Sequence, residues 1–488
     1  MTRQKSLKIN ASLNIIKQLC QVLFPLISIP YVTRVLGPES YGKFNYGNSI
    51  VSYFVLIAAL GINSYAVREG VVFRDNKEKI EKFVSEIFSI NILSTVVSYS
   101  LLVVLLFFPF TEPYRRVIAI QSLIIILTTI GTDWINTIYE DFAYITIRYI
   151  IFQCVSLACM FVFVHKPDDY LIYAMVVVGA QAGANILNIF HVRKYVRIKP
   201  TRNIDWQKHM KPILIFFANI VAITIYVNSD ITMLGIFRTD RDVGLYTLAS
   251  RIYTIVKQVL NAIVVVTLPR LSLLIKNNNR DNFNALLDKI QKALLLLIFP
   301  ATVGMMFLSE DIINIISGAE YVGGYSALIV LSIAIIFSLL ATFYTSCVMI
   351  PLKLERYVLT ATIVSALSNI ILNLFFIPML GFNGAAVTTL ISEIIVFGIG
   401  FFVSNRCGIR KLEMRYCLKI FVGSLVVAGI CFVVSRTFDS SFSRILLSIV
   451  VSVPVYFLVE IFLKNDFVID EMRRIIVIAN NIISSRKE

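Results

Sequence analysis

The chain has 488 residues, of which 57% are hydrophobic and 15% are charged, and its formal net charge is +15. A soluble domain carries about 25% charged residues, so the composition excludes an ordinary soluble protein and predicts an all-α integral membrane protein. The seven cysteines and three histidines show no metal-ligand spacing, so we expect neither a metal site nor a cofactor.

Apolar runs of about 18–25 residues indicate membrane-spanning helices. Fourteen such helices are predicted, near residues 11–33, 44–63, 84–109, 117–139, 143–164, 170–190, 211–236, 244–269, 290–308, 325–350, 358–380, 384–405, 416–435 and 443–463. With both termini on the cytoplasmic side, the inside segments hold 34 of the 45 basic residues and the outside loops hold nine. This bias follows the positive-inside rule. The excess charge therefore sets orientation against anionic lipid and does not indicate nucleic-acid binding.

A weak internal repeat organises the chain. Residues 42–50, GKFNYGNSI, correspond to residues 244–252, GLYTLASRI, and at the same offset GAQAGA at 179–184 corresponds to GFNGAA at 381–386. We therefore expect a six-helix lobe at 1–205 with an inter-lobe linker near 191–211, a second six-helix lobe at 206–410, and two additional helices with a cytoplasmic tail at 411–488. Two lobes that run in the same sense are related by an axis along the membrane normal, as in alternating-access carriers.

Charged side chains inside the hydrocarbon are costly, so each is a candidate functional residue. The basic and polar candidates for substrate binding are Lys17, Arg34, Arg251, Lys257, Asn14, Gln18 and Asn48. A water-filled cavity with four cations would suit an anionic substrate such as a phosphate or diphosphate, held by charge-assisted hydrogen bonds. The acidic candidates for ion coupling are Asp230, Asp133 and Glu393. The alternatives are side chains that reach the interface or structural ion pairs between the lobes.

Two other function classes are not favoured by the sequence. The stretch 37–43, GPESYGK, is similar to a phosphate-binding loop, but Phe44 stands where that motif needs Ser or Thr, and no strand precedes it. No loop is long enough for a soluble catalytic domain, so we expect a protein that is not an enzyme.

Three stretches resemble one transporter family. Residues 34–42, RVLGPESYG, followed by NSI at 48–50, resemble the signature between the first two helices of Wzx-type polysaccharide repeat-unit flippases. These belong to the multidrug/oligosaccharidyl-lipid/polysaccharide exporter superfamily. The stretch from Asp230 through Ile252 is similar to that family's seventh and eighth helices, and the stretch from Gly381 to Glu393 is similar to its twelfth.

The resemblance implies two helical lobes that move an undecaprenyl-diphosphate-linked oligosaccharide to the outer leaflet of the bacterial cytoplasmic (inner) membrane. The pathway would be O-antigen, capsule or exopolysaccharide assembly. By position, Lys17, Arg34, Arg251 and Lys257 would receive the diphosphate. Further expected partners are the bilayer, a coupling proton or sodium ion, a polysaccharide polymerase and glycosyltransferases.

Two alternatives stay open at this point. The additional helix pair is similar to that of the peptidoglycan-precursor flippases, which would make lipid II the cargo. A cation-coupled multidrug exporter of the same superfamily is less favoured, because such exporters use intramembrane carboxylates and the first helix here is cationic.

Overall fold

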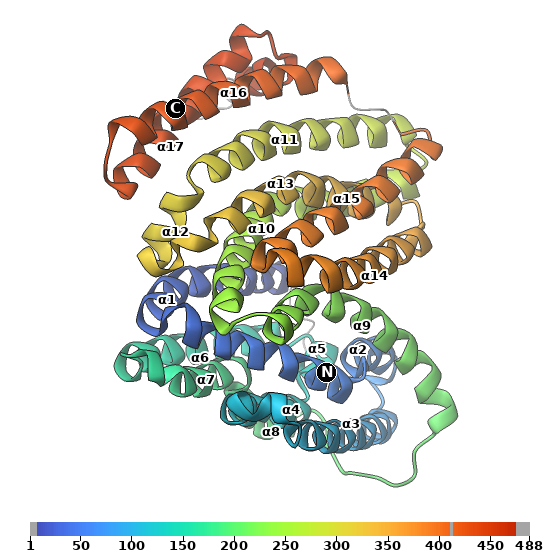
Figure 1. The fold of residues 1–488 in the computed structure, drawn as a ribbon. Helices are drawn as coiled ribbons and strands as arrows, with labels where there is room; N and C mark the ends of the chain where they lie inside the picture. Colours follow the sequence, from blue (N-terminus) through green and yellow to red (C-terminus); the bar gives the residue numbers. More distant parts are fainter. Residues whose placement is uncertain (1–6, 410–412, 475–488) are drawn as a thin grey trace, which may run out of the picture. The chain divides into compact units, whose positions relative to one another are not determined.

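The computed structural model describes residues 7–409 and 413–474, which are helical almost throughout and contain no strand (Figure 1). Thirteen of the described helical segments are long and apolar enough to cross a membrane. The prediction of an all-helical protein that crosses the membrane many times is therefore confirmed. The chain divides into two compact units, Met1–Thr247 and Leu248–Glu488. The two-lobe boundaries and the cytoplasmic position of the termini stay predictions.

The first unit contains a series of long helices joined by short turns. Its elements are α1 (Leu7–Ala59), α2 (Ile62–Phe73), α3 (Lys77–Leu106), η1 (Pro109–Tyr114), α4 (Arg115–Gly131), α5 (Asp133–Ile138), α6 (Phe142–Phe163), η2 (Pro167–Asp169), α7 (Tyr170–Val178), η3 (Gly179–Gly183), α8 (Ala184–Val192), α9 (Trp206–Phe237) and the start of α10 (Asp240–Lys276).

The helix α1 is two helices joined at a kink. Gly37 has φ 68° and ψ 172°, and Pro38 follows it directly. Glycine adopts this backbone without a steric penalty, and proline suits the first position of a new helix. The sequence predicts a connection between residues 33 and 44, and the structure replaces it by this single break. The segment Ile16–Phe73 has 58 residues, about 87 Å of helix at 1.5 Å per residue, which is enough for the first two predicted crossings of a core about 30 Å thick.

The two copies of the sequence repeat meet within the first unit. A Cβ atom on Gly42 would lie 1.8 Å from the carbonyl oxygen of Asp240, and one on Gly244 would lie 2.0 Å from the carbonyl oxygen of Pro38. The hydroxyl of Tyr114 also donates to Asp240 at 2.7 Å. The absence of side chains at these two glycines therefore lets α1 and the start of α10 approach backbone to backbone.

An apolar cluster of the first unit joins helix ends that the predicted topology places on the cytoplasmic side. It includes buried side chains of α2, α3, α5 and α9, among them Tyr65, Phe83, Trp134 and Ile213. Buried within it, the ring of His209 contacts Glu86 and the hydroxyl of Tyr65, both at 2.7 Å. These contacts fix the beginning of α9 against α2 and α3.

The second unit begins within α10 and places the last two helices against α11 (Figure 1). Its further elements are α11 (Arg280–Phe307), α12 (Ser309–Ser317), η4 (Ala319–Gly324), α13 (Tyr325–Thr342), η5 (Phe343–Met349), α14 (Glu355–Leu380), α15 (Phe382–Arg406), α16 (Met414–Thr437) and α17 (Ser441–Phe462). The helix α15 packs between α13 and α14, while α16 packs on both α11 and α17. Buried residues of α11, α16 and α17 form one apolar cluster that includes Leu296, Ile420 and Tyr456.

Candidate functional site

A buried ion pair lies at the centre of the second unit. Oε1 of Glu393 on α15 accepts from Nζ of Lys257 on α10 at 3.0 Å. The same oxygen accepts from the hydroxyl of Tyr253 at 2.9 Å and from that of Ser338, on α13, at 2.8 Å. The side chain of Glu393 is 6% exposed and that of Lys257 is 29% exposed. Three helices are therefore joined at one carboxylate oxygen.

This arrangement brings together two residues that the sequence analysis assigned to different tasks. Lys257 was predicted to bind substrate and Glu393 to couple an ion, yet the ammonium of one neutralises the carboxylate of the other. Their separation of 136 residues gives no linear signal of the contact. A buried carboxylate with three donors is well satisfied, so removal of the lysine would leave a buried charge with two neutral donors.

The acid predicted in the seventh span is buried in the first unit. Asp230 on α9 is 6% exposed, and its Oδ2 accepts from the hydroxyl of Tyr246 on α10 at 2.5 Å. Two residues further along α9, the hydroxyl of Thr232 donates to that of Ser49 at 3.0 Å. Asn48 lies beside this contact on α1 and is partly buried. Polar side chains of α1, α9 and α10 thus face protein within the span.

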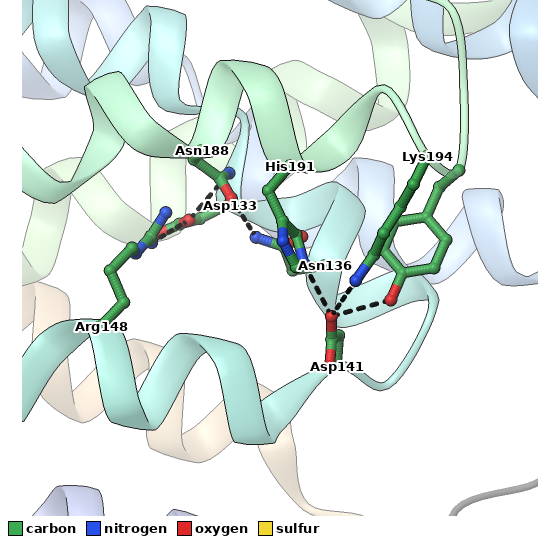
Figure 2. A network of polar contacts seen from close by, with 8 residues as sticks. Asp133, Asn136, Asp141, Arg148, Asn188, His191 and Lys194 are labelled. Carbon is green, nitrogen blue, oxygen red and sulfur yellow. Dashed lines mark hydrogen bonds and ion pairs between the residues drawn. The ribbon is translucent and has the colours of Figure 1, made fainter.

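Asp133 belongs to a polar network that joins α5, α6 and α8 (Figure 2). Its Oδ1 accepts from Nη2 of Arg148 at 2.5 Å and from Nδ2 of Asn188 at 3.2 Å. Asn188 also donates to the carbonyl of Gly131 and accepts from Nδ2 of Asn136 at 2.7 Å. The arginine is 6% exposed, whereas the aspartate side chain is 47% exposed. The pair of Asp133 and Arg148 was not predicted from the sequence.

A second acid, Asp141, lies at the neighbouring end of this network (Figure 2). Its Oδ2 accepts from the hydroxyl of Tyr195 at 2.7 Å and Nζ of Lys194 at 3.0 Å, and it contacts Nε2 of His191 at 2.8 Å. Burial, followed by the hydrogen bond to Asp141, raises the pKa of the Tyr195 phenol. This group was not predicted from the sequence. Two sequence features could have indicated it: an acid directly before one helix, α6, and a basic segment directly after another, α8.

The other predicted site residues lie at separate places in the two units. Lys17 lies with its Nζ 5.9 Å from the ring centroid of Tyr149, while Gln18 and Arg34 are exposed on α1. Arg251 is exposed on α10, in the second unit. The side chain of Asn14 lies outside the residues whose side chains are described. The four-cation cavity therefore stays a prediction.

The comparisons with known proteins agree on one class. The chain is 25% identical over 276 residues to a putative O-antigen transporter of Escherichia coli K12, covering 56% of this chain and 66% of that protein. It is 27% identical over 209 residues to a probable low-salt glycan biosynthesis flippase, Agl15, of Haloferax volcanii, covering 42% of this chain and 43% of that one. The chain therefore spans about two thirds of the Escherichia coli protein and less than half of the Haloferax volcanii protein.

Two further similarities cover most of the chain. It is 24% identical over 397 residues to the capsular polysaccharide biosynthesis protein CapF of Staphylococcus aureus, which is 78% of this chain and 94% of that protein. In structure it is similar to the lipid II flippase MurJ in an inward closed conformation, with a TM-score of 0.72 and 20% identity, over 92% of this chain and 98% of that one. At this identity the likeness shows the fold.

The family itself follows from the match of residues 7–275, more than half of the chain, to the model of the polysaccharide biosynthesis protein family. The chain belongs to the polysaccharide biosynthesis protein family, and the predicted kinship with Wzx-type flippases of the multidrug/oligosaccharidyl-lipid/polysaccharide exporter superfamily is confirmed.

Proposed function

We propose that this protein flips an undecaprenyl-diphosphate-linked oligosaccharide from the cytoplasmic to the outer leaflet of a bacterial inner membrane, for the assembly of a surface polysaccharide. The observation that carries the proposal is the combination of two matches in one chain. Residues 7–275 match the polysaccharide biosynthesis family, and 92% of the chain has the fold of a lipid flippase. A polymerase and glycosyltransferases would be its partners in the pathway.

The physical task of such a protein is to remove a solvation barrier without chemistry. Each unsatisfied polar group of an oligosaccharide costs several kcal/mol in hydrocarbon. A hydrated cavity that opens alternately to the two sides removes this cost. The membrane potential can bias the direction, since it contributes about 2.3 kcal/mol per charge per 100 mV.

We propose that the predicted cations contact the diphosphate at successive positions along the transport path and not at a single site. Lys17 and Arg34 are 17 residues apart on α1, which is about 25 Å of helix at 1.5 Å per residue. One diphosphate cannot contact both. Under the predicted topology, Lys17 would meet the headgroup near the inner leaflet and Arg34 near the outer one. Arg251 would provide the corresponding charge on α10, whereas Lys257 is already paired with Glu393.

Ion coupling would use the three predicted acids, Asp133, Asp230 and Glu393. A coupling ion at Asp133 or Glu393 would compete with the basic side chain from which each acid accepts. Asp230 accepts from a tyrosine hydroxyl. Occupation of these acids would therefore be linked to rearrangement of α6, α9 and α10.

The test is translocation in proteoliposomes that hold a fluorescent undecaprenyl-diphosphate oligosaccharide. Wild type is compared with Arg251→Ala, and with Lys353→Ala as a control, because Lys353 is an exposed lysine in a turn between helices. We expect transport by wild type and the control and at least a tenfold loss in Arg251→Ala. A wild type that moves labelled lipid II but not the oligosaccharide would reassign the cargo. Exchange of a drug cation for protons, with neither lipid moved, would refute the flippase proposal.

A further inference from the structure

The additional helix α17 carries a polar stripe on its buried face. Ser448, Ser452, Tyr456 and Glu460 recur at every fourth position, and all four side chains are buried. The last of them, Glu460, is 0% exposed and lies near the end of a helix that is apolar enough to span a membrane. A buried carboxylate is stable only when it is paired with a cation, well hydrogen-bonded, or neutral.

Among the described residues, the carboxyl group of Glu460 accepts one hydrogen bond, from the side chain of Asn465. The chain turns at Lys464, which has φ 53°, and this returns Asn465 to the end of α17. Nδ2 of Asn465 donates to Oε2 of Glu460 at 2.7 Å, and Asn465 is also 0% exposed. Two oxygens of this pair, Oε1 of the acid and Oδ1 of the amide, are buried with no hydrogen-bond partner among the described residues. Both oxygens are acceptors, so they can form a hydrogen bond with each other only if one of them carries a proton.

Among the described residues, no basic side chain lies close enough to Glu460 to form an ion pair with it, although Lys419 attracts its carboxylate at longer range. Oε1 of Glu460 points at α16, where a Cβ atom on Gly423 would lie 2.5 Å from it. The ammonium of Lys419, on α16, donates to the backbone carbonyl of Lys464 at 2.7 Å. No ion pair joins Glu460 to a described basic residue.

The neighbouring tyrosine hydroxyls donate their hydrogen atoms to backbone carbonyls, although that of Tyr416 also lies against the side chain of Asn465. That of Tyr416, on α16, donates to the carbonyl of Lys292 at 2.8 Å, and that of Tyr456 donates to the carbonyl of Leu296 at 2.9 Å. Both carbonyls belong to α11. Tyr416 and Tyr456 thus each donate to a backbone oxygen of α11 and not to Oε1 of Glu460.

One proton would satisfy both unpartnered oxygens. A carboxylic acid and a primary amide form a cyclic pair, in which the amide N–H donates to the carboxyl C=O and the carboxyl O–H donates to the amide oxygen. The first of these two bonds is already present. We propose that Glu460 and Asn465 form a proton-binding site, occupied at neutral pH, in which a proton taken from solvent resides on Oε1 of Glu460 and is donated to Oδ1 of Asn465. The inference does not depend on the proposed cargo.

In its protonated, uncharged form the site would stabilise the packing of α17 against α16 and against the segment that follows residue 465. Loss of the proton would leave a buried carboxylate with one donor, and the end of α17 would loosen from α16. Because the site lies wholly within the second unit, this effect is local to the additional helix pair and the residues that follow it.

The first experiment is infrared spectroscopy of the full chain in lipid nanodiscs at neutral pH. We expect a C=O stretching band of a protonated carboxyl group in wild type that is absent from Glu460→Gln, retained in the exposed-acid control Glu355→Gln, and shifted in Asn465→Leu. Absence of any difference between wild type and Glu460→Gln would overturn the proposal.

The second experiment tests which occupant neutralises the site. A glutamine amide can make the same two hydrogen bonds as the protonated acid, so the melting temperature of Glu460→Gln at neutral pH should equal that of wild type. At alkaline pH, wild type should melt at a lower temperature than Glu460→Gln. If instead Na⁺ or K⁺ raises the melting temperature of wild type but not that of Glu460→Gln, a metal cation occupies the two oxygens and the proton site is refuted.

Discussion

Replacing Lys257 by methionine tests whether the ion pair in the second unit is structural. Methionine keeps most of the aliphatic stem and removes the charge. Breaking a buried ion pair by removing one partner costs about 3–5 kcal/mol. We expect about 3 kcal/mol, the lower end, because Lys257 is 29% exposed and because Tyr253 and Ser338 still donate to Glu393.

The double variant Lys257→Met/Glu393→Gln separates two contributions to the loss of unfolding free energy: the lost ion-pair contact, and the buried carboxylate charge that Lys257→Met leaves without a cation. The glutamine oxygen can still accept from the hydroxyls of Tyr253 and Ser338, so the loss should fall to about 1 kcal/mol, the contribution of an ordinary hydrogen bond. The assay is chemical unfolding in detergent micelles, with Arg251→Ala as the exposed control, expected within about 0.5 kcal/mol of wild type. If Lys257→Met also lies within that range, the pair does not hold the unit together and the reasoning fails.

Three further changes test the first unit. Asp133→Asn should lower its unfolding free energy by about 3 kcal/mol, because it leaves a buried arginine without a charged partner; an unchanged unfolding midpoint would contradict this. Gly42→Ala should lower the melting temperature, since its methyl group would lie 1.8 Å from the carbonyl of Asp240, and an unaltered melting curve would show that the helices separate without cost. Tyr195→Phe should cost about 1 kcal/mol in chemical unfolding through the lost hydrogen bond to Asp141, whereas a gain in stability would contradict the bond.

The helices could be predicted from the sequence because lipid imposes a local requirement on every span. Each crossing needs a long apolar run, and each run is visible without knowledge of its neighbours. The break at Gly37 could be predicted for the same reason, since glycine followed by proline acts on the local backbone. The structure adds that this break is a kink within a continuous helical segment and not a loop.

The partners of the buried charges could not be predicted, because they depend on packing between distant helices. Glu393 meets a lysine 136 positions away, and Asp141 meets groups at least 50 positions away. Even the pair of Asp133 and Arg148, only 15 positions apart, depends on the left-handed residue Thr132, which ends α4 and begins α5. Composition shows that such charges need partners, but it does not show which ones.

These pairings divide the predicted cations into those already paired with a carboxylate and those exposed to a substrate. A diphosphate gains charge-assisted hydrogen bonds only from a cation it can reach and whose donors it does not have to share. Lys257 already donates to a buried carboxylate, whereas Arg251, on the same helix, is exposed. We therefore expect Arg251→Ala to lower transport in proteoliposomes without changing stability, and Lys257→Met to lower both together. Equal transport by Arg251→Ala and wild type, with Lys257→Met impaired, would instead mean that the second unit contributes to transport through its fold and not through an accessible charge.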